Sequence, residues 1–318
     1  MICTEIIGRL GNQMFRYAYA RALQEQYGEP LLFSFKDIER QYDPAKGWEN
    51  SLKYFHVKQY ETYHGNSSLM RERTNLIQRV AAAIYFTISH KYDDDFYKRY
   101  QFQIKWQGLM GHLGIYGLHM GYYDYKPTKA KDKFIIGCCE CDKYFNAIRP
   151  QLLEEFTPID APAEKNRKLY EVIENTNSVC VTIRRGDFVE NKKFKEVYDV
   201  CTKSYYYRGM QEIANRVKDP CFIIFSDDIP WIKKHMDFPY PVYYEDGDDT
   251  VQEKLRMMYS CKHFVLSNST FSWWAQYLSR NEQKIVVSPN RWYNSRFQTA
   301  LIGADWILLD PDKETQDK

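Results

Sequence analysis

The 318-residue chain is long enough for two domains, and its 44% hydrophobic residues supply a sizeable core. A formal net charge of only +2 argues against nucleic-acid binding as its main function. The N-terminus MICTEIIGRLGNQ lacks the pattern of a signal peptide, and no apolar run is long enough to span a membrane. We expect a cytoplasmic protein without a transmembrane segment, with peripheral attachment at the inner membrane as the alternative.

Strand-like runs alternate with helical patterns from the N-terminus onward, which predicts α/β layers with parallel sheets. We expect a strand at 2–8, a helix from about Asn12 and a second strand at 30–35. Residues 41–125 are irregular, aromatic and charged, and they predict an insertion with helical pieces. A strand at 134–137 and a helix at 142–156 close the first half.

A change of composition at 156–166 predicts a boundary between domains 1–156 and 157–318. A helix is expected at 165–176, followed by the strands SVCVTIRR, PCFIIFSDD, HFVLSNS and KIVVSP. The first three of these runs end in polar clusters. Because ligands bind beyond the carboxyl ends of parallel strands, we expect these clusters to share one crevice.

The eight cysteines are expected to be free thiols, because several lie in apolar runs and no secretion signal accompanies them. Cys138 and Cys141 form a C-x-x-C pair, which we interpret as incidental, with a redox pair as the alternative. The aspartate runs at 93–95 and 246–249 follow no clear apolar strand, so we interpret both as solvated loops. The sequence therefore predicts no metal site.

The stretch GRLGNQ at 8–13 places two glycines in a strand-to-helix turn. Glycines allow a close approach of the backbone to a ligand, and the N-terminus of the following helix favours anions. Arg9 and Asn12 are candidates for ligand contact. The alternative is a plain tight turn with Asn12 as a cap.

The strand SVCVTI runs directly into Arg184, Arg185, Gly186 and Asp187. Buried strands rarely tolerate unpaired guanidinium groups, so we expect the two arginines either to face concentrated negative charge or to lie at a strand end exposed to solvent. One arginine can bind a phosphate while the other anchors the loop, and Asp187 can pair with either or bind a ligand hydroxyl. The alternative is a solvated strand end with an internal ion pair.

Two further polar clusters follow strands. Ser226, Asp227 and Asp228 come after one strand, where helix capping and ligand contact both remain open. The segment 268–272 lies at another strand-to-helix junction, whose N–H groups and hydroxyls can cradle a pyrophosphate. Ser269 or Thr270 acting as a simple N-cap is the alternative there.

Together and in this order, the motifs resemble the bacterial α-1,2-fucosyltransferases of glycosyltransferase family eleven. The resemblance rests on GRLGNQMFRYAYARAL, KYFNAIRPQLLEEF, IRRGDF, FSDDIPW and CKHFVLSNSTFSWWAQYL. The stretch GRLGNQ and the arginine motif IRRGDF are also similar to motifs of the wider fucosyltransferase superfamily, which includes protein O-fucosyltransferases. One departure is Thr182, which stands where the family usually has a histidine two residues before the first arginine.

The resemblance implies an α/β fold of the GT-B type, with two Rossmann-like domains facing a central cleft. Residues 1–156 would form the acceptor side and 157–318 would bind GDP-fucose. The implied enzyme is an inverting galactoside α-1,2-fucosyltransferase of surface polysaccharide synthesis, which moves L-fucose from GDP-fucose to the 2-hydroxyl of a terminal galactoside. Alternatives are another acceptor or linkage, including protein O-fucosylation, and a non-catalytic protein that binds glycans or nucleotides.

The same resemblance implies no cofactor and no metal, with GDP-fucose as the co-substrate. It assigns catalysis to Arg184 and Asp187, with Arg184 stabilising charge on the leaving diphosphate. The implied donor-binding residues are Arg9, Asn12, Arg185, Ser226, Asp227, Asp228, Asn268, Ser269, Thr270, Phe271 and Ser272. Asp187, Glu190 and Asp124 are the carboxylate candidates for deprotonating the acceptor, and the sequence does not choose among them.

Overall fold

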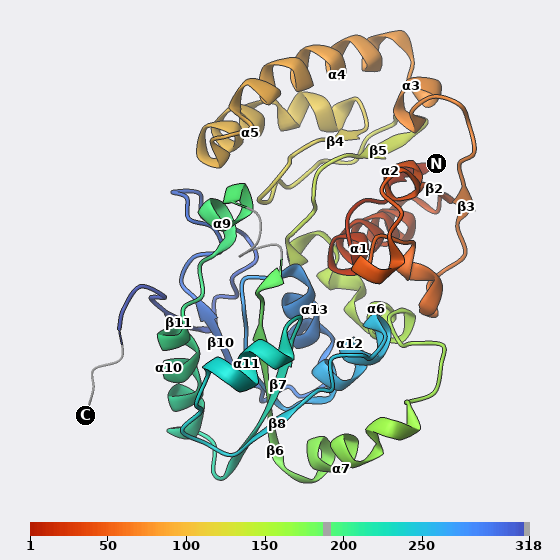
Figure 1. The fold of residues 1–318 in the computed structure, drawn as a ribbon. Coiled ribbons are helices and arrows are strands. Elements are labelled where there is room, and N and C mark those ends of the chain that lie inside the picture. Colours follow the sequence, from red (N-terminus) through yellow and green to blue (C-terminus); the bar gives the residue numbers. More distant parts are fainter. Residues whose placement is uncertain (187–191, 315–318) are drawn as a thin grey trace. The chain divides into compact units, whose positions relative to one another are not determined.

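The computed structural model describes residues 1–186 and 192–314, which form two compact units. Unit 1 comprises Met1–Phe156 with Ser295–Ala300, and unit 2 comprises Thr157–Asn294 with Leu301–Lys318. Each unit contains one parallel sheet with helices packed on it (Figure 1). The predicted α/β class with two Rossmann-like units, the GT-B type, is confirmed. The predicted central cleft between them stays a prediction.

Unit 1 is built on a five-stranded sheet with the order β3-β2-β1-β5-β4. Its strands are β1 (Ile2–Glu5), β2 (Leu31–Ser34), β3 (Glu61–Thr62), β4 (Ile115–Tyr116) and β5 (Lys133–Ile135). All pairings are parallel, and β1 lies in the centre of the sheet. The chain continues from β1 to β2 and β3 on one side and only later adds β4 and β5 on the other, so the strand order reverses beside β1.

The helices of unit 1 are α1 (Leu10–Tyr27), α2 (Lys36–Arg40), α3 (Leu69–Arg73), α4 (Leu76–Ser89), α5 (Phe96–His112) and α6 (Arg149–Glu155). Helix α1 begins two residues before the predicted start and ends at Gly28, whose φ of +65° is the left-handed conformation that glycine adopts at helix ends. The predicted helix at 142–156 is wrong over its first half. There the chain forms two short 3-10 turns before α6 begins.

Unit 2 is built on a six-stranded parallel sheet with the order β11-β10-β9-β6-β7-β8. Its strands are β6 (Asn177–Ile183), β7 (Pro220–Ser226), β8 (Val242–Tyr244), β9 (His263–Val265), β10 (Val286–Pro289) and β11 (Ile307–Leu309). Its helices are α7 (Arg167–Asn175), α9 (Lys192–Tyr198), α10 (Lys203–Ala214), α11 (Ile229–His235), α12 (Val251–Ser260) and α13 (Thr270–Leu278). The four predicted strands of this half are therefore present, and β8 and β11 are additions.

The core of unit 2 explains why its strands read as unbroken apolar runs. Val179, Val181, Phe222, Ile224 and Val265 are buried together beneath the helices of the unit. A parallel sheet covered on both faces selects continuous β-branched and aromatic residues rather than alternation. Polar side chains are consequently confined to the strand ends, which is where the candidate site lies.

Candidate functional site

The candidate site lies at the carboxyl edge of the sheet in unit 2. Strand β6 has β7 and β9 as parallel neighbours, with Ile183 opposite Ser226 and Val181 opposite Val265. The segments that follow the three strands therefore emerge side by side. The strand order also reverses between β6 and β9, and this reversal marks the usual ligand crevice of an open α/β sheet.

Arg184 is held at this edge by Asp227. Its Nη1 lies 2.6 Å from Asp227 Oδ2, and the other carboxylate oxygen accepts the backbone N–H of Arg185 at 2.9 Å. Asp227 thus fixes both the side chain of one arginine and the backbone of the next. Gly186 belongs to the same arrangement, because a Cβ added there would lie 2.6 Å from Asp227 Oδ2. The partner of Arg184 thus comes from the end of β7 and not from its own motif, and the pair is only partly open to solvent. The ion pair within the motif, predicted as an alternative, involves Asp187, which lies outside the described residues.

Arg185 is placed differently. Its guanidinium lies over the ring of Trp231, with Cζ 3.2 Å from the ring centroid, and its Nε is 3.7 Å from Asp228 Oδ2. Asp228 in turn caps α11, since its Oδ1 accepts the Trp231 N–H at 3.1 Å. The Ser226 hydroxyl accepts the Asp228 N–H at 3.1 Å. Of the two interpretations of this cluster, helix capping and ligand contact, Asp228 therefore shows helix capping.

Thr182 occupies a buried position on β6 that links two of the polar clusters. Its hydroxyl oxygen accepts the backbone N–H of Ser267 at 2.9 Å. Ser267 Oγ lies 2.9 Å from Ser272 Oγ in the first turn of α13. Thr182 thus ties the end of β6 to the turn leading into α13.

The segment from Asn268 to Ser272 divides into buried and accessible parts. Asn268 is buried, and its amide donates to the carbonyls of Tyr198 and Trp292 at 2.8 and 2.9 Å. Ser269, Thr270 and Phe271 are partly exposed at the N-terminus of α13. Within the described residues the Ser269 side chain makes no capping hydrogen bond, although its carbonyl accepts the Trp273 N–H at 2.9 Å. The accessible N-terminus of a nine-residue helix is a favourable place for an anion.

The predicted residues of the first motif belong to unit 1. Arg9 occupies the N-cap position of α1, and Asn12 packs so closely on Gly8, which has a φ of +69°, that a Cβ there would meet its amide at 2.7 Å. Gln13 is buried and donates to the carbonyls of Gly8 and Glu49 at 2.9 and 2.7 Å. The glycine is therefore required by its conformation and by the close approach of Asn12.

Arg16 is a structural residue that the sequence interpretation missed. It is buried, and its guanidinium donates to the carbonyls of Glu5 and Ile136 at 2.5 and 2.7 Å. These carbonyls lie at the carboxyl ends of β1 and β5, the two strands between which the order reverses, since Glu5 is the last residue of β1 and Ile136 directly follows β5. Its spacing of three residues from Gln13, on the same helix face, was the available signal.

The cysteines are free thiols, as predicted. Burial and the nearby Glu140 carboxylate raise the pKa of Cys138 to about 12, which disfavours a reactive thiolate. Its Sγ lies 3.7 Å from Nδ1 of His119. Burial, together with the charges of Arg99 and Arg16, lowers the pKa of His119 to about 3.

Asp187 and Glu190 lie outside the described residues. The third carboxylate candidate, Asp124, is exposed and pairs with Lys126 at 2.6 Å. The solvated-loop interpretation of 246–249 needs one correction, because the Asp249 carboxylate is nearly buried and accepts a hydrogen bond from Asn166 at 2.8 Å. Within residues 1–186 and 192–314, no three His, Cys, Asp or Glu side chains are grouped so as to hold a metal ion.

The site brings arginines, carboxylates and an accessible helix N-terminus together where the strand order of a parallel sheet reverses. This arrangement is typical of proteins that bind phosphorylated ligands. The family model described as glycosyl transferase family 11 matches residues 1–310. The chain belongs to this family and is a glycosyltransferase, as its motifs predicted.

Two curated relatives are similar over nearly the whole chain, and a third is similar over about half of it. An α-1,2-colitosyltransferase of Escherichia coli is 26% identical over 302 residues, which cover 92% of each chain. The O-antigen biosynthesis glycosyltransferase WbnK of Escherichia coli is 25% identical over 312 residues, covering 95% of this chain and 98% of WbnK. The mouse galactoside 2-α-L-fucosyltransferase Sec1 is 25% identical over 185 residues, about half of each chain.

Among solved structures, the chain is similar to the α-1,6-fucosyltransferase NodZ of Bradyrhizobium. The crystal soaked with GDP-fucose matches with a TM-score of 0.46 and 10% identity, covering 87% of this chain and 92% of NodZ. In the part of the chain that the structure describes, no helix is long and apolar enough to cross a membrane.

Proposed function

We propose that the protein transfers L-fucose from GDP-fucose to the 2-hydroxyl of a terminal galactoside, with inversion at the anomeric carbon. Family membership and a relative named galactoside 2-α-L-fucosyltransferase support the reaction class. A relative named for O-antigen biosynthesis supports a surface polysaccharide as the destination of the product.

The observation that carries this proposal is the placement of Arg184. Its guanidinium is oriented by Asp227 at the end of the central strand β6, beside the strand that leads into α13. A guanidinium and a helix N-terminus can bind two different oxygens of one diphosphate. We assign the diphosphate of GDP to this edge, held by Arg184 and by the backbone and hydroxyls of Ser269 and Thr270. Ser272, predicted as a third such residue, is buried with its Oγ 2.9 Å from Ser267 Oγ, so we give it a positioning role.

In the proposed step, the bond between the fucose anomeric carbon and the β-phosphate oxygen breaks, and GDP leaves with the electron pair. The acceptor 2-hydroxyl attacks the opposite face of the sugar and gives its proton to a base. Negative charge grows on the β-phosphate, where a preorganised guanidinium stabilises the transition state more than the ground state. We propose that this stabilisation needs no metal ion, and we keep Asp187 as a candidate for the second catalytic role.

The remaining predicted residues receive narrower roles in this proposal. Asp227 positions Arg184, and Asn268 positions the turn before α13 through its two hydrogen bonds to carbonyls. The Arg185 guanidinium, stacked on Trp231, would bind the nucleotide rather than the reacting centre. Arg9, Asn12 and the acceptor-side role of unit 1 follow from the family resemblance.

GDP-colitose is the second candidate donor, because one relative is named as a colitosyltransferase. Colitose is L-fucose without its 3-hydroxyl, so the two GDP-sugars would present the same diphosphate to Arg184. A site that hydrogen-bonds the 3-hydroxyl rejects an analogue lacking it, because its own polar groups are then left unpaired.

The test is a transfer assay in EDTA with GDP-fucose and GDP-colitose, each offered with β-galactosides and with a protein acceptor. We expect GDP release coupled to a product in which NMR shows α-L-fucose on the galactose 2-hydroxyl. Transfer to a different position or to protein would overturn the acceptor assignment. A preference for GDP-colitose would overturn the donor sugar, and glycan binding without consumption of either donor would overturn the enzyme assignment.

A further inference from the structure

Unit 1 carries an exposed apolar surface on α4 and α5, which we call the α4–α5 face. Helix α4 packs on α5, and α5 packs on β4 (Figure 1). Six large apolar side chains form the face and are each 45–73% exposed: Leu76, Ile77, Val80, Ile84, Trp106 and Leu109. Between the two helices lies a groove of about 580 Å³ lined by these and neighbouring apolar residues.

The apolar side chains of this helix pair are not confined to its buried side. Beside the buried apolar residues Ala82, Tyr85 and Met110, the buried positions hold polar side chains, which are Gln78, Ser89, Gln103 and Gln107. These are satisfied internally: Gln78 donates to the Leu113 carbonyl at 2.8 Å, and Gln103 donates to Ser89 Oγ at 2.8 Å. A surface helix normally turns its apolar stripe to the core and its amides to solvent. The outward apolar face therefore suits an apolar neighbour.

Charge is unevenly distributed along the pair. The start of α4 and the end of α5 lie together, as the bond from Gln78 to the Leu113 carbonyl shows. Five exposed basic residues lie on the segments that meet at this end and, in the case of Lys105, further along α5; we call them the basic rim: Arg71, Arg79, Lys105, Lys129 and Lys131. At the opposite end, where α4 turns into α5, the acidic run 93–95 is balanced by neighbouring bases, since Asp93 pairs with Arg99 and Asp95 pairs with Lys98, each at 3.1 Å. The two most exposed apolar residues, Leu76 and Ile77, lie at the basic end.

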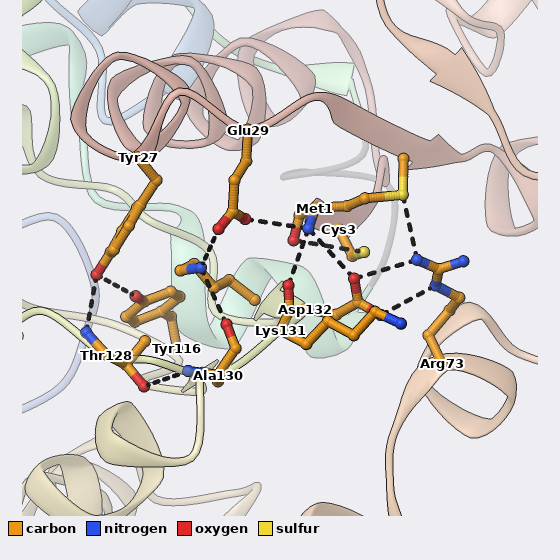
Figure 2. Close-up of polar contacts among 11 residues, drawn as sticks. Met1, Cys3, Tyr27, Glu29, Arg73, Tyr116, Thr128, Ala130, Lys131 and Asp132 are labelled. Atoms are coloured by element: carbon orange, nitrogen blue, oxygen red, sulfur yellow. Dashed lines mark hydrogen bonds and ion pairs between the residues drawn. The ribbon is translucent and has the colours of Figure 1, made fainter.

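The loop that carries Lys129 and Lys131 is fixed in place, as Figure 2 shows. The Thr128 backbone N–H donates a hydrogen bond to the Tyr27 hydroxyl, and the Thr128 hydroxyl donates one to the His112 carbonyl at the end of α5. The N-terminal ammonium binds the Lys131 carbonyl at 3.0 Å. The acidic groups of this network are paired: Asp132 binds Arg73 at 3.1 Å and Glu29 binds Lys133 at 2.6 Å. The charge of the basic rim is thus not cancelled by these carboxylates.

We infer that the α4–α5 face docks the protein on the surface of an anionic lipid bilayer. Leu76 and Ile77 enter the boundary between headgroups and acyl chains, and Trp106 lies at the headgroup level, where indole rings are favoured. The basic rim meets the negative surface potential of the lipids. This surface belongs to unit 1, whereas the candidate site belongs to unit 2, and the inference rests on none of the assignments in the proposed transfer reaction.

The charges favour lipid over a second copy of the chain. A copy that covered Leu76 and Ile77 with its own counterparts would bring two basic rims together, and like charges repel. An anionic bilayer instead attracts the basic rim and at the same time accepts Leu76 and Ile77, which we call the apolar tip. Long Lys and Arg side chains can also extend their charged ends to the headgroups while their stems stay against apolar surface.

The test is cosedimentation of the full chain with phosphatidylcholine vesicles that contain or lack one-third phosphatidylglycerol. Leu76→Glu/Ile77→Glu removes the apolar tip, and acidic residues in the first turn of α4 suit the helix dipole, so folding should persist. Lys105→Gln/Lys129→Gln/Lys131→Gln weakens the rim. Ile159→Glu, at a 55% exposed position of unit 2, is the matched control.

We expect the wild type and Ile159→Glu to bind only the anionic vesicles. The tip variant should bind at least 10-fold more weakly, and the rim variant about fivefold more weakly per lysine, with a loss that high salt reproduces. Thermal unfolding of each variant confirms the fold. The inference is overturned if the wild type does not sediment with anionic vesicles, or if the tip variant binds as the wild type does. Sedimentation velocity that shows a dimer dissociated by the tip variant, without vesicle binding, would assign the face to a second copy instead.

Discussion

The pairing of Arg184 with Asp227 leads to the most informative mutational prediction. Arg184→Ala removes the group proposed to stabilise the leaving diphosphate, and kcat should fall by about 100- to 1,000-fold, the range for loss of one preorganised donor. Asp227→Asn keeps an acceptor for the Arg185 N–H but loses the charge 2.6 Å from Arg184 Nη1. We expect kcat to fall by about 10- to 100-fold, because the guanidinium is still present but less well oriented.

The effect on stability should be much smaller than the effect on turnover. The two side chains are 19% and 25% exposed, so solvent screens their attraction. A charge-assisted hydrogen bond in this setting contributes about 1 kcal/mol, and the free energy of unfolding should fall by no more than that amount. Urea unfolding of the Asp227→Asn variant measures this change directly.

A double-mutant cycle separates positioning from an independent role. If Asp227 acts through Arg184, adding Asp227→Asn to Arg184→Ala should lower kcat by less than about threefold further. Steady-state kinetics of the four proteins with the GDP-sugar and a galactoside acceptor give the coupling. Effects that multiply in the double variant would refute the positioning role, and normal turnover of Arg184→Ala would refute the assignment of Arg184.

Three further predictions concern the surroundings of the site. Thr182→Val leaves the buried N–H of Ser267 without its acceptor, so urea unfolding should show a loss of about 1–3 kcal/mol. Gly186→Ala places a Cβ 2.6 Å from Asp227 Oδ2 at a positive φ, and it should destabilise the protein by about 1–2 kcal/mol and lower kcat, whereas unchanged values would contradict the geometry. The pKa of His119 is lowered to about 3 in the folded state, against 6.5 in the unfolded chain, so the unfolded chain binds the proton first on acidification. The contribution of neutral His119 to the free energy of unfolding is therefore complete above pH 6.5. It is lost at about 1.4 kcal/mol per pH unit as the pH falls towards 3. His119→Gln should remove that slope from a series of unfolding curves, and an unaltered slope would assign it to other groups.

The sequence predicted the sheets well because their physical signals are local. Buried parallel strands such as β6 and β7 need unbroken apolar residues, and their polar ends are visible as abrupt changes of composition. Short strands at the sheet edges were missed, since β3 has two exposed residues and β8 has three residues without full burial. Their pairing comes from the neighbouring strand rather than from their own residues.

The neighbours of the site residues were less predictable than the residues themselves. The link between Arg184 and Asp227 joins positions 43 residues apart through the order of strands β6 and β7, which no local pattern encodes. Asn268 reads as a candidate ligand contact in the sequence, yet its amide is engaged by two carbonyls. The α4–α5 face was also hidden, because a periodic pattern gives the apolar side of a helix but not the direction in which it faces.

In the proposed reaction, the carboxyl edge of the sheet in unit 2 binds the diphosphate of GDP through Arg184. Thermal shift of the wild type and of Arg184→Ala with GDP, UDP and ADP, each in EDTA, tests this most directly. We expect GDP to raise the unfolding temperature of the wild type selectively in EDTA, and we expect this stabilisation to be lost in Arg184→Ala. No response to GDP, a response that requires a divalent metal, or equal stabilisation of both proteins would contradict it.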